Sequence, residues 1–129
     1  MDWEPLVEAA LAVRERAHAA YSGYRVGAAL LFEDGEIVSG CNVENRLPSL
    51  AVCAERVAMV RAVTHGHLHP SALVVATVSR PPAAPCGLCL ETLAEFVEDL
   101  PILLVNLDGA REEVRMTDLL TRRFKLPSH

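Results

Sequence analysis

Cys53-Ala54-Glu55 and the later stretch Pro85-Cys86-Gly87-Leu88-Cys89 decide how this chain folds and which chemistry it supports. Together they supply three thiols and one carboxylate. Three cysteine thiolates fill three positions of a tetrahedral zinc ion, and the last position stays open for water, as catalytic zinc requires. Zinc lowers the pKa of that water towards neutrality and so provides hydroxide as a nucleophile. The two stretches therefore predict a catalytic zinc site with Cys53, Cys86 and Cys89 as its protein ligands.

Glu55 is the expected proton carrier of this site, because it stands two residues after the first thiolate. The layout Cys-x-Glu followed by Pro-Cys-x-x-Cys is the one that zinc deaminases acting on cytosine or adenine use. In such a reaction Glu55 accepts a proton as water becomes hydroxide and later gives a proton to the leaving amine, which departs as ammonia. The alternative is that Glu55 is an ordinary acidic residue in the first turn of a helix, where the helix dipole favours it.

Other candidate metal ligands have simpler explanations. Cys41 has apolar neighbours in a predicted strand, and free cysteine is among the most buried residue types, so we expect it to pack in the core. The competing hypothesis is a closed, structural zinc site with Cys41 as the fourth ligand. A redox role for the Cys-x-x-Cys pair would leave Cys53 and Glu55 without an explanation. Three histidines are expected in a polar loop rather than at a metal: His65, His67 and His69.

Both cysteine stretches fall where helices are expected to begin. A helix N-terminus carries unpaired N–H groups and a partial positive charge, which favour thiolate over thiol. Three thiolates on Zn²⁺ still leave an excess of negative charge, which a nearby cation would offset. We expect Arg56 to be this cation and to donate hydrogen bonds to the thiolates. The alternative is that Arg56 is simply exposed to solvent.

Composition excludes several classes of protein. The chain has 129 residues, which predicts a single domain over residues 1–129, and a formal net charge of -5. An acidic chain without a basic cluster is a poor candidate for binding nucleic acid. No stretch is apolar enough to span a membrane, and the first residues lack the features of a secretory signal. With four cysteines and no such signal, we expect a cytoplasmic protein.

Hydrophobic patterns predict alternating helices and strands. A helix spanning 50–63 is apolar around most of its circumference, so we expect it to be buried on nearly all sides and to form part of a subunit interface. The pattern predicts a three-layer α/β/α sandwich around a mixed five-stranded sheet. The other expected elements are helices over 4–20 and from 86 towards 101, strands over 26–32, 36–42, 72–78, 102–105 and 112–116, and a helical turn over 117–120.

Several stretches resemble one enzyme family, the small homotetrameric zinc cytidine deaminases, over roughly residues 5–124. The resemblance implies that family's fold, a Zn²⁺ cofactor on the three cysteines, and a homotetramer with its sites at subunit interfaces. It is carried by Val26-Gly27-Ala28-Ala29-Leu30, Gly40-Cys41-Asn42-Val43-Glu44-Asn45, Cys53-Ala54-Glu55-Arg56, Pro85-Cys86-Gly87-Leu88-Cys89, and Leu119-Leu120 with Phe124.

The resemblance also implies a set of substrate contacts. Asn42 and Glu44 share a face if the chain is extended, and the family would use them to bind the ribose hydroxyls. Tyr24, where the family usually has Phe, would lie against the pyrimidine, and the backbone of Ala54 would contact the base. Phe124 would come from a neighbouring subunit. The alternatives are turn residues for the first pair and core aromatics for Tyr24 and Phe124.

We therefore expect a zinc-dependent hydrolase that cleaves the C–N bond of a cyclic amidine. Its expected reaction converts cytidine or 2'-deoxycytidine to the uridine product, with release of ammonia, in pyrimidine salvage. The substrate is a small nucleoside, and neither nucleic acid nor a membrane is expected as a partner.

Two departures from the family pattern keep other functions open. Arg46-Leu47-Pro48 replaces small residues and a Tyr, and Leu90-Glu91 replaces an Arg-Gln pair. The altered loop could admit a modified or 4-substituted pyrimidine nucleoside or a nucleoside-like antibiotic, and Arg46 could contact a larger or anionic substituent. A non-catalytic, zinc-stabilised interaction module is the remaining alternative. Glu55 opposes it, because structural zinc needs no proton carrier.

Overall fold

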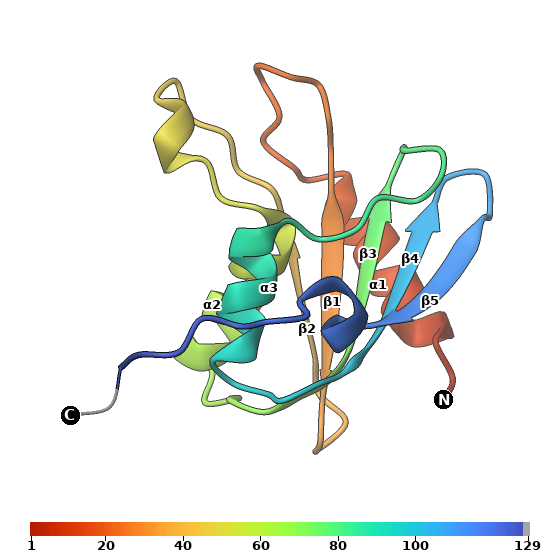
Figure 1. Cartoon of the computed structure of the whole chain (residues 1–129). Helices are drawn as coiled ribbons and strands as arrows, with labels where there is room; N and C mark the ends of the chain where they lie inside the picture. Colours follow the sequence, from red (N-terminus) through yellow and green to blue (C-terminus); the bar gives the residue numbers. More distant parts are fainter. Residues whose placement is uncertain (128–129) are drawn as a thin grey trace.

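A mixed sheet of five strands lies at the centre of the computed structural model, which describes residues 1–127 (Figure 1). The neighbouring strands β3 (Pro70–Thr77) and β4 (Pro101–Asn106) run parallel, and the other neighbouring pairs are antiparallel. The predicted mixed five-stranded sheet is therefore confirmed. In spatial order the strands are β2 (Ile37–Cys41), β1 (Gly27–Phe32), β3 (Pro70–Thr77), β4 (Pro101–Asn106) and β5 (Arg111–Arg115).

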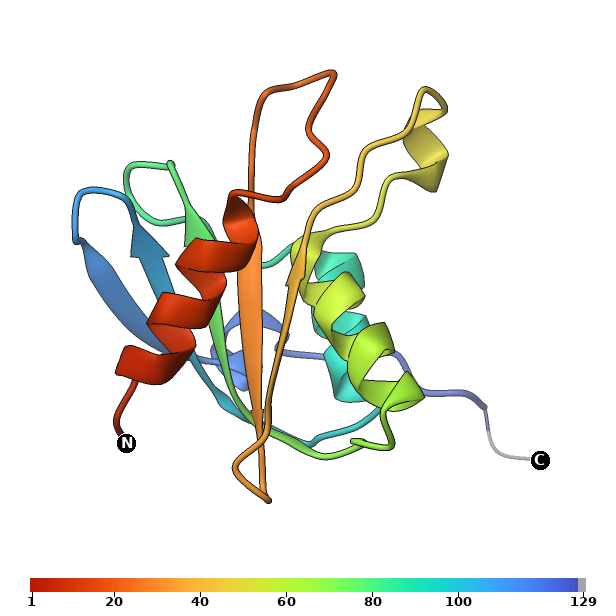
Figure 2. The same cartoon turned by 180° about the vertical axis from the view of Figure 1, so that it is seen from behind.

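Helices cover both faces of this sheet, as the predicted three-layer sandwich requires. Helix α1 (Glu4–Arg14) packs on one face, and α2 (Ala54–Thr64) lies with α3 (Gly87–Ala94) on the other (Figure 2). A short 3-10 helix, η1 (Pro48–Leu50), precedes α2, and α4 (Met116–Leu119) follows β5. Within residues 1–127, no helix is both long and apolar enough to cross a lipid bilayer.

The central strand β3 shows why the sheet needs both helical layers. Alternate side chains of a strand point to opposite faces. Leu73 and Val75 join the core beneath α2 and α3, whereas Val74 and Ala76 join the core beneath α1. All four are buried, so a continuous apolar run correctly predicted a strand that is covered on both faces.

Two predicted helices are shorter than expected at the end nearest the polar loops. The first ends at Arg14 rather than at residue 20, because His18 pairs with the chain beside Val43. The second begins at Ala54 rather than at residue 50, because Val52 also pairs with Val43. Backbone hydrogen bonds between distant segments thus replace helical ones at both places.

Two further helix predictions need correction. The helix after Cys86 ends at Ala94, well before Pro101, and the chain continues through irregular turns. Helix α2 is not buried on nearly all sides within one chain: Ala58 and Met59 face the sheet, whereas Val60 is 54% exposed and Val63 is also exposed. The outer face of α2 therefore exposes apolar side chains in the single chain, together with Arg61 and Thr64.

Candidate active site

Three cysteines converge at the N-termini of α2 and α3. Cys53 is the N-cap of α2, Cys86 is the N-cap of α3, and Cys89 lies in the first turn of α3. The sulfurs of Cys53 and Cys86 are 3.8 Å apart, and those of Cys86 and Cys89 are 3.5 Å apart. Tetrahedral zinc with Zn–S bonds of about 2.3 Å places its sulfur ligands about 3.8 Å from one another. The cluster therefore has the size that a zinc ion requires.

The electrostatics of the cluster also fit a cation. Burial raises the pKa of the Cys53 thiol. Burial, together with the negative charges of Glu55 and Cys53, raises the pKa of Cys89 far above its ordinary value. Burial opposes ionisation of Cys86 too, but hydrogen bonds from backbone N–H groups in the first turn of α3 and from the Cys89 and Cys53 thiols together outweigh it and lower the pKa of Cys86. A divalent ion between the sulfurs would stabilise all three thiolates.

Arg56 lies beside the cluster, in the first turn of α2. Its Nη2 is 4.0 Å from the Cys53 sulfur and donates a hydrogen bond of 3.3 Å to the carbonyl of Ala51. Its Nε is a buried side-chain nitrogen with no hydrogen-bond partner among the described residues. The structure thus places a positive charge where three thiolates on a divalent ion would leave an excess of negative charge.

Glu55 is buried in the first turn of α2, with only 5% of its surface exposed. Burial raises the pKa of its carboxyl group, and the lowering contributed by its own backbone N–H and by Arg56 is smaller. Its carboxylate lies close enough to the cluster for its charge to raise the pKa of Cys89. Cys53 itself has extended backbone as the N-cap, so the two residues are not two positions of one helical turn. That bend in the chain brings the carboxylate to the cluster.

A cavity of about 320 Å³ opens next to these groups. This volume is at the lower end of the range for small-molecule sites, as expected for a small ligand. Most of its walls are apolar, and the polar groups are few and come from separate segments. It is lined by Tyr24, Val26, Asn42, Glu44, Ala51, Val52, Cys53, Ala54, Glu55, Val75, Thr77, Ala83, Ala84 and Cys86.

Asn42 and Glu44 line the cavity and also hold the loop before β1. Asn42 Oδ1 accepts a hydrogen bond of 2.8 Å from the Val26 N–H, and its Nδ2 donates one of 2.8 Å to the Tyr24 carbonyl. Glu44 accepts hydrogen bonds from the hydroxyl and N–H of Ser22 and from the Tyr21 N–H. These bonds, above all the one from the Ser22 hydroxyl, hold the pKa of Glu44 below its ordinary value. Glu44 is therefore an oriented carboxylate.

The two predicted aromatic contacts fall in different places. Tyr24 lines the cavity and is 37% exposed. Phe124 does not line the cavity and is 70% exposed on the C-terminal segment. The structure therefore gathers Tyr24 with the other predicted site residues, but it does not bring Phe124 to the site of its own chain.

The alternative metal ligands lie elsewhere. Among residues 1–127, Cys53, Cys86 and Cys89 are the group of three whose ligand atoms approach within 4.8 Å of one another, and Cys41 is not a member. The hypothesis of a closed four-cysteine site with Cys41 is therefore wrong. His67 stacks against Phe32 and lies 3.5 Å from a carboxylate oxygen of Asp34, away from the cysteines.

Sequence reasoning missed several residues of the site. Ser22 orients Glu44, and Ser79 shares a hydrogen bond with Tyr24. Thr77, at the end of β3, forms part of the cavity wall. The available signal was position: Thr77 and Ser79 stand at the carboxyl end of a buried strand that neighbours a parallel one, where α/β sheets commonly bind ligands.

The chain is similar to several known proteins. The family model "Cytidine and deoxycytidylate deaminase zinc-binding region" matches residues 2–103. A cytidine deaminase of Sporosarcina psychrophila is 43% identical over 96% of this chain and 92% of its own length, and one of Halalkalibacterium halodurans is 38% identical over 96% and 95%. The crystal structure of a Burkholderia pseudomallei cytidine deaminase superposes with a TM-score of 0.92 at 39% identity, covering 96% of this chain and all of that one. The chain therefore belongs to the cytidine and deoxycytidylate deaminase family, and its three-cysteine cluster fits that family's zinc site.

Proposed function

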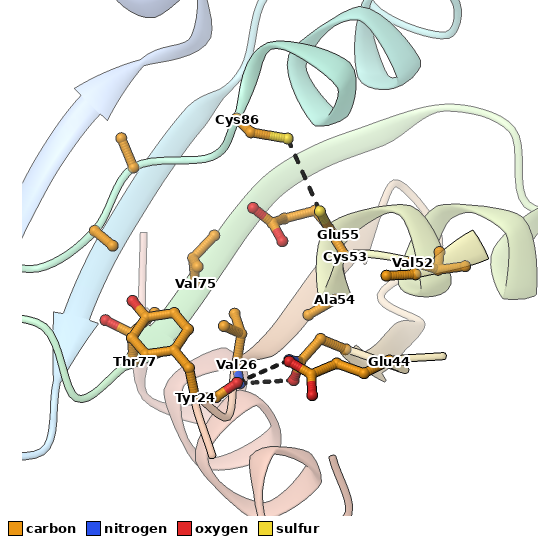
Figure 3. A pocket seen from close by; sticks show the side chains of 14 residues that line it. Tyr24, Val26, Glu44, Val52, Cys53, Ala54, Glu55, Val75, Thr77 and Cys86 are labelled. Carbon is orange, nitrogen blue, oxygen red and sulfur yellow. Dashed lines mark hydrogen bonds between the residues drawn. The ribbon is translucent and has the colours of Figure 1, made fainter. Parts of the chain in front are cut away.

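We propose that the chain, acting as a single domain over residues 1–129, catalyses the hydrolytic deamination of cytidine and 2'-deoxycytidine to the uridine products with release of ammonia. One observation carries the proposal: Glu55, Cys53 and Cys86 lie at one end of the cavity, and Glu44 lies at the other (Figure 3). A nucleoside offers an amino-bearing base at one end and ribose hydroxyls at the other, so both ends find a matching group. The names of the similar proteins support cytidine as the substrate.

We assign zinc binding to Cys53, Cys86 and Cys89. Zinc, when bound there, lowers the pKa of water towards neutrality and so supplies hydroxide. Glu55 takes up the proton that this water releases and passes it to the ring nitrogen. It then takes up the hydroxyl proton of the adduct at the amino-bearing carbon and delivers that second proton to the departing amine. Burial raises the pKa of Glu55, which suits a carboxyl group that must hold a proton during part of each turnover. Arg56 offsets the excess negative charge of the three thiolates.

Glu44, Asn42 and Ala54 retain hydrogen-bonding capacity for a substrate. A carboxylate has about four acceptor positions, and Glu44 uses three of them within the chain, so one remains for a ribose hydroxyl. Asn42 uses one of its two Nδ2 hydrogens. Ala54 is the first residue of α2, where backbone N–H groups lack helical partners, so its N–H is available to the base. Tyr24 supplies an aromatic wall for the pyrimidine.

We further propose that the enzyme is a homotetramer in which Phe124 enters the site of a neighbouring subunit. Phe124, Val60 and Val63 are exposed apolar side chains in the single chain, and an interface would bury them. The acidic balance and the four free cysteines support a cytoplasmic enzyme of pyrimidine salvage that binds neither nucleic acid nor membranes.

A modified pyrimidine nucleoside, a 4-substituted one or a nucleoside-like antibiotic is the second candidate substrate. The loop that carries Arg46-Leu47-Pro48 and η1 projects from the domain, and its apolar residues Leu47 and Leu50 are exposed (Figure 1). An exposed apolar loop of this kind would cover a surface of another subunit and could form the rim of that subunit's cavity. Its unusual sequence would then change which substituents are accepted.

A substrate panel tests the proposal. The zinc-loaded protein is incubated with cytidine, 2'-deoxycytidine, cytidine monophosphate and a 4-substituted cytidine, and ultraviolet absorbance and ammonia release are followed. We expect turnover of the first two, and a loss of about 10²- to 10⁴-fold in kcat for Glu55→Gln. Glu8→Gln, an exposed glutamate on α1, is the matched control and should keep full activity. Zinc binding without turnover of any nucleoside would instead support an interaction module.

A further inference from the structure

Tyr24 and Ser79 form a hydroxyl pair across the edge of the cavity. The Tyr24 hydroxyl lies 2.5 Å from the Ser79 Oγ, although the residues are 55 positions apart in the sequence. Tyr24 precedes β1, and Ser79 follows β3, so the pair joins two separate loops. We propose that Ser79 is a positioning residue for substrate binding: it holds the Tyr24 ring in place as one wall of the nucleoside site. The role in turnover rests on the proposed function, but the contact itself does not.

Ser79 is itself fixed by the ends of two strands. Its N–H donates to Thr77 Oγ1 at 3.1 Å, and its carbonyl accepts from Asn106 Nδ2 at 3.1 Å. Both partners are buried. Asn106 is held in turn, because its Oδ1 accepts hydrogen bonds from the N–H groups of Asp108 and Ala110. Ser79 is therefore tied to the carboxyl ends of β3 and β4.

Tyr24 is fixed at its backbone as well as at its hydroxyl. Its N–H donates to Ser22 Oγ at 2.9 Å, and its carbonyl accepts from Asn42 Nδ2 at 2.8 Å. The side chain between these anchors lines the cavity near Thr77 (Figure 3). Without the Ser79 bond, the ring would have only its backbone anchors and could adopt other rotamers, because it is partly exposed.

If the Tyr24 ring is already oriented before the substrate binds, the protein loses less side-chain conformational entropy on binding. Ordering one free side chain on binding weakens affinity by about 2- to 10-fold. The effect should appear in KM and not in kcat, because neither hydroxyl belongs to the cysteine cluster or bonds to Glu55. A polar bond far from the reacting atoms thus contributes to substrate affinity.

The first test is steady-state kinetics of the zinc-loaded protein with cytidine. We expect Ser79→Ala to raise KM by about 2- to 10-fold with kcat within twofold, and Ser79→Thr, which keeps a hydroxyl, to restore KM. Tyr24→Phe should raise KM by a similar factor, and the double variant should add nothing further. Ser71→Ala is the matched control: Ser71 also bonds through Oγ, to the Leu31 carbonyl, but at the opposite end of β3. An unchanged KM in Ser79→Ala, or single effects that multiply, would overturn the proposal.

A second test needs no turnover and so separates this inference from the proposed function. The protein contains two tyrosines, Tyr21 and Tyr24, so labelling with 3-fluorotyrosine gives two ¹⁹F resonances that Tyr21→Phe assigns. We expect Ser79→Ala to shift and narrow the Tyr24 resonance, because the ring gains freedom, and Ser71→Ala to leave it in place. If Ser79→Ala leaves the Tyr24 resonance unchanged, Ser79 does not position the ring, whatever the substrate proves to be.

Discussion

Gly40 of β2 lies directly against Ala58 of α2: a Cβ atom built on Gly40 would be 2.4 Å from the backbone nitrogen of Ala58 and 2.8 Å from the carbonyl oxygen of Ala54. Both contacts are with backbone, which cannot turn aside as a side chain would. The helix that carries Glu55, with Cys53 at its N-cap, can therefore pack this closely on β2 only because residue 40 has no side chain.

Gly40→Ala should consequently displace α2 from the sheet. We expect it to lower the free energy of unfolding by about 3 kcal/mol or more, and to reduce zinc retention, because the added methyl group has no space. Urea unfolding and zinc content of the purified protein measure the two effects. Ser39→Ala, one residue earlier on the same strand, adds no volume and should change stability by about 0.5 kcal/mol or less. Normal stability in Gly40→Ala would show that α2 can move away without cost.

The sequence predicted the sheet and the cysteine cluster because both depend on local patterns. An apolar run such as that of β3 identifies a strand wherever it occurs, and the spacing of Cys86 and Cys89 sets one ligand at the N-cap of α3 and the other in its first turn. The early end of α1 could not be predicted, because it depends on the pairing of His18 with Val43, which lies 25 positions away in the sequence. Local propensity says nothing about such a partner.

The missing parts of the candidate site have the same physical origin. Ser22 and Ser79 are ordinary loop serines in the sequence, and only the fold brings them to Glu44 and Tyr24. Glu55 could be predicted because it stands inside a motif whose chemistry fixes its spacing, and Ala54 was expected at the site through the family resemblance. Residues that orient a site through distant hydrogen bonds carry no comparable signal.

Cys41 and Cys89 provide a matched pair for the metal assignment. Cys89 is fully buried in the cluster, whereas Cys41 is half-buried and outside it. Cys89→Ser should therefore lower the apparent affinity for zinc by about 100-fold or more, because it removes one ligand. It should also lose turnover. Cys41→Ser should keep both. Zinc content by elemental analysis, and competition with a chromophoric chelator, measure the result; equal zinc loss in the two variants would contradict the three-cysteine assignment.

The ionised carboxylate of Asp99 should stabilise the folded protein, and this stabilisation should be lost in acid. Burial opposes ionisation of this carboxyl group, but hydrogen bonds from the Thr117 N–H and the Arg115 guanidinium, at 3.1 and 2.9 Å, lower its pKa. A carboxyl group with a lowered folded pKa stabilises the fold above its unfolded pKa of about 3.9, and this contribution is lost as pH falls through the folded value.

The comparison of wild type with Asp99→Asn isolates this contribution. We expect the variant to be less stable by about 1 kcal/mol at pH 6, and the difference to disappear as the pH falls through the lowered pKa of folded Asp99. Chemical unfolding followed by circular dichroism over this pH range measures it. If the stability difference between wild type and Asp99→Asn stays constant over this pH range, the asparagine destabilises the fold for a steric reason, and the charge of Asp99 contributes nothing.

Phe124 tests the proposed assembly, because its neighbours in the chain hold it in a defined place. Arg123 donates to the carbonyls of Ala94, the last residue of α3, and of Val97, which follows the helix; the Phe124 N–H donates to Glu91 Oε1 at 3.0 Å. The backbone is thus anchored while the ring is 70% exposed. Phe124→Ala should leave the packing of one chain unchanged, raise KM for cytidine by about 10-fold or more, and weaken the tetramer on light scattering. Leu126→Ala, which truncates another exposed apolar side chain on the same segment, is the control.

Mixing two defective variants decides whether the ring serves its own site or a neighbour's. Glu55→Gln subunits lack the proton carrier but keep Phe124. Phe124→Ala subunits keep the proton carrier but lack the ring. If Phe124 enters a neighbour's cavity, tetramers re-formed from an equal mixture contain some sites with both intact groups, and a fraction of turnover with wild-type KM returns. If the ring serves the site of its own chain, no mixed tetramer contains a complete site, and the mixture shows only the high-KM activity of the Phe124→Ala subunits. The exposed ring beside an anchored backbone favours the first outcome, because a side chain held away from its own cavity can reach only a different one.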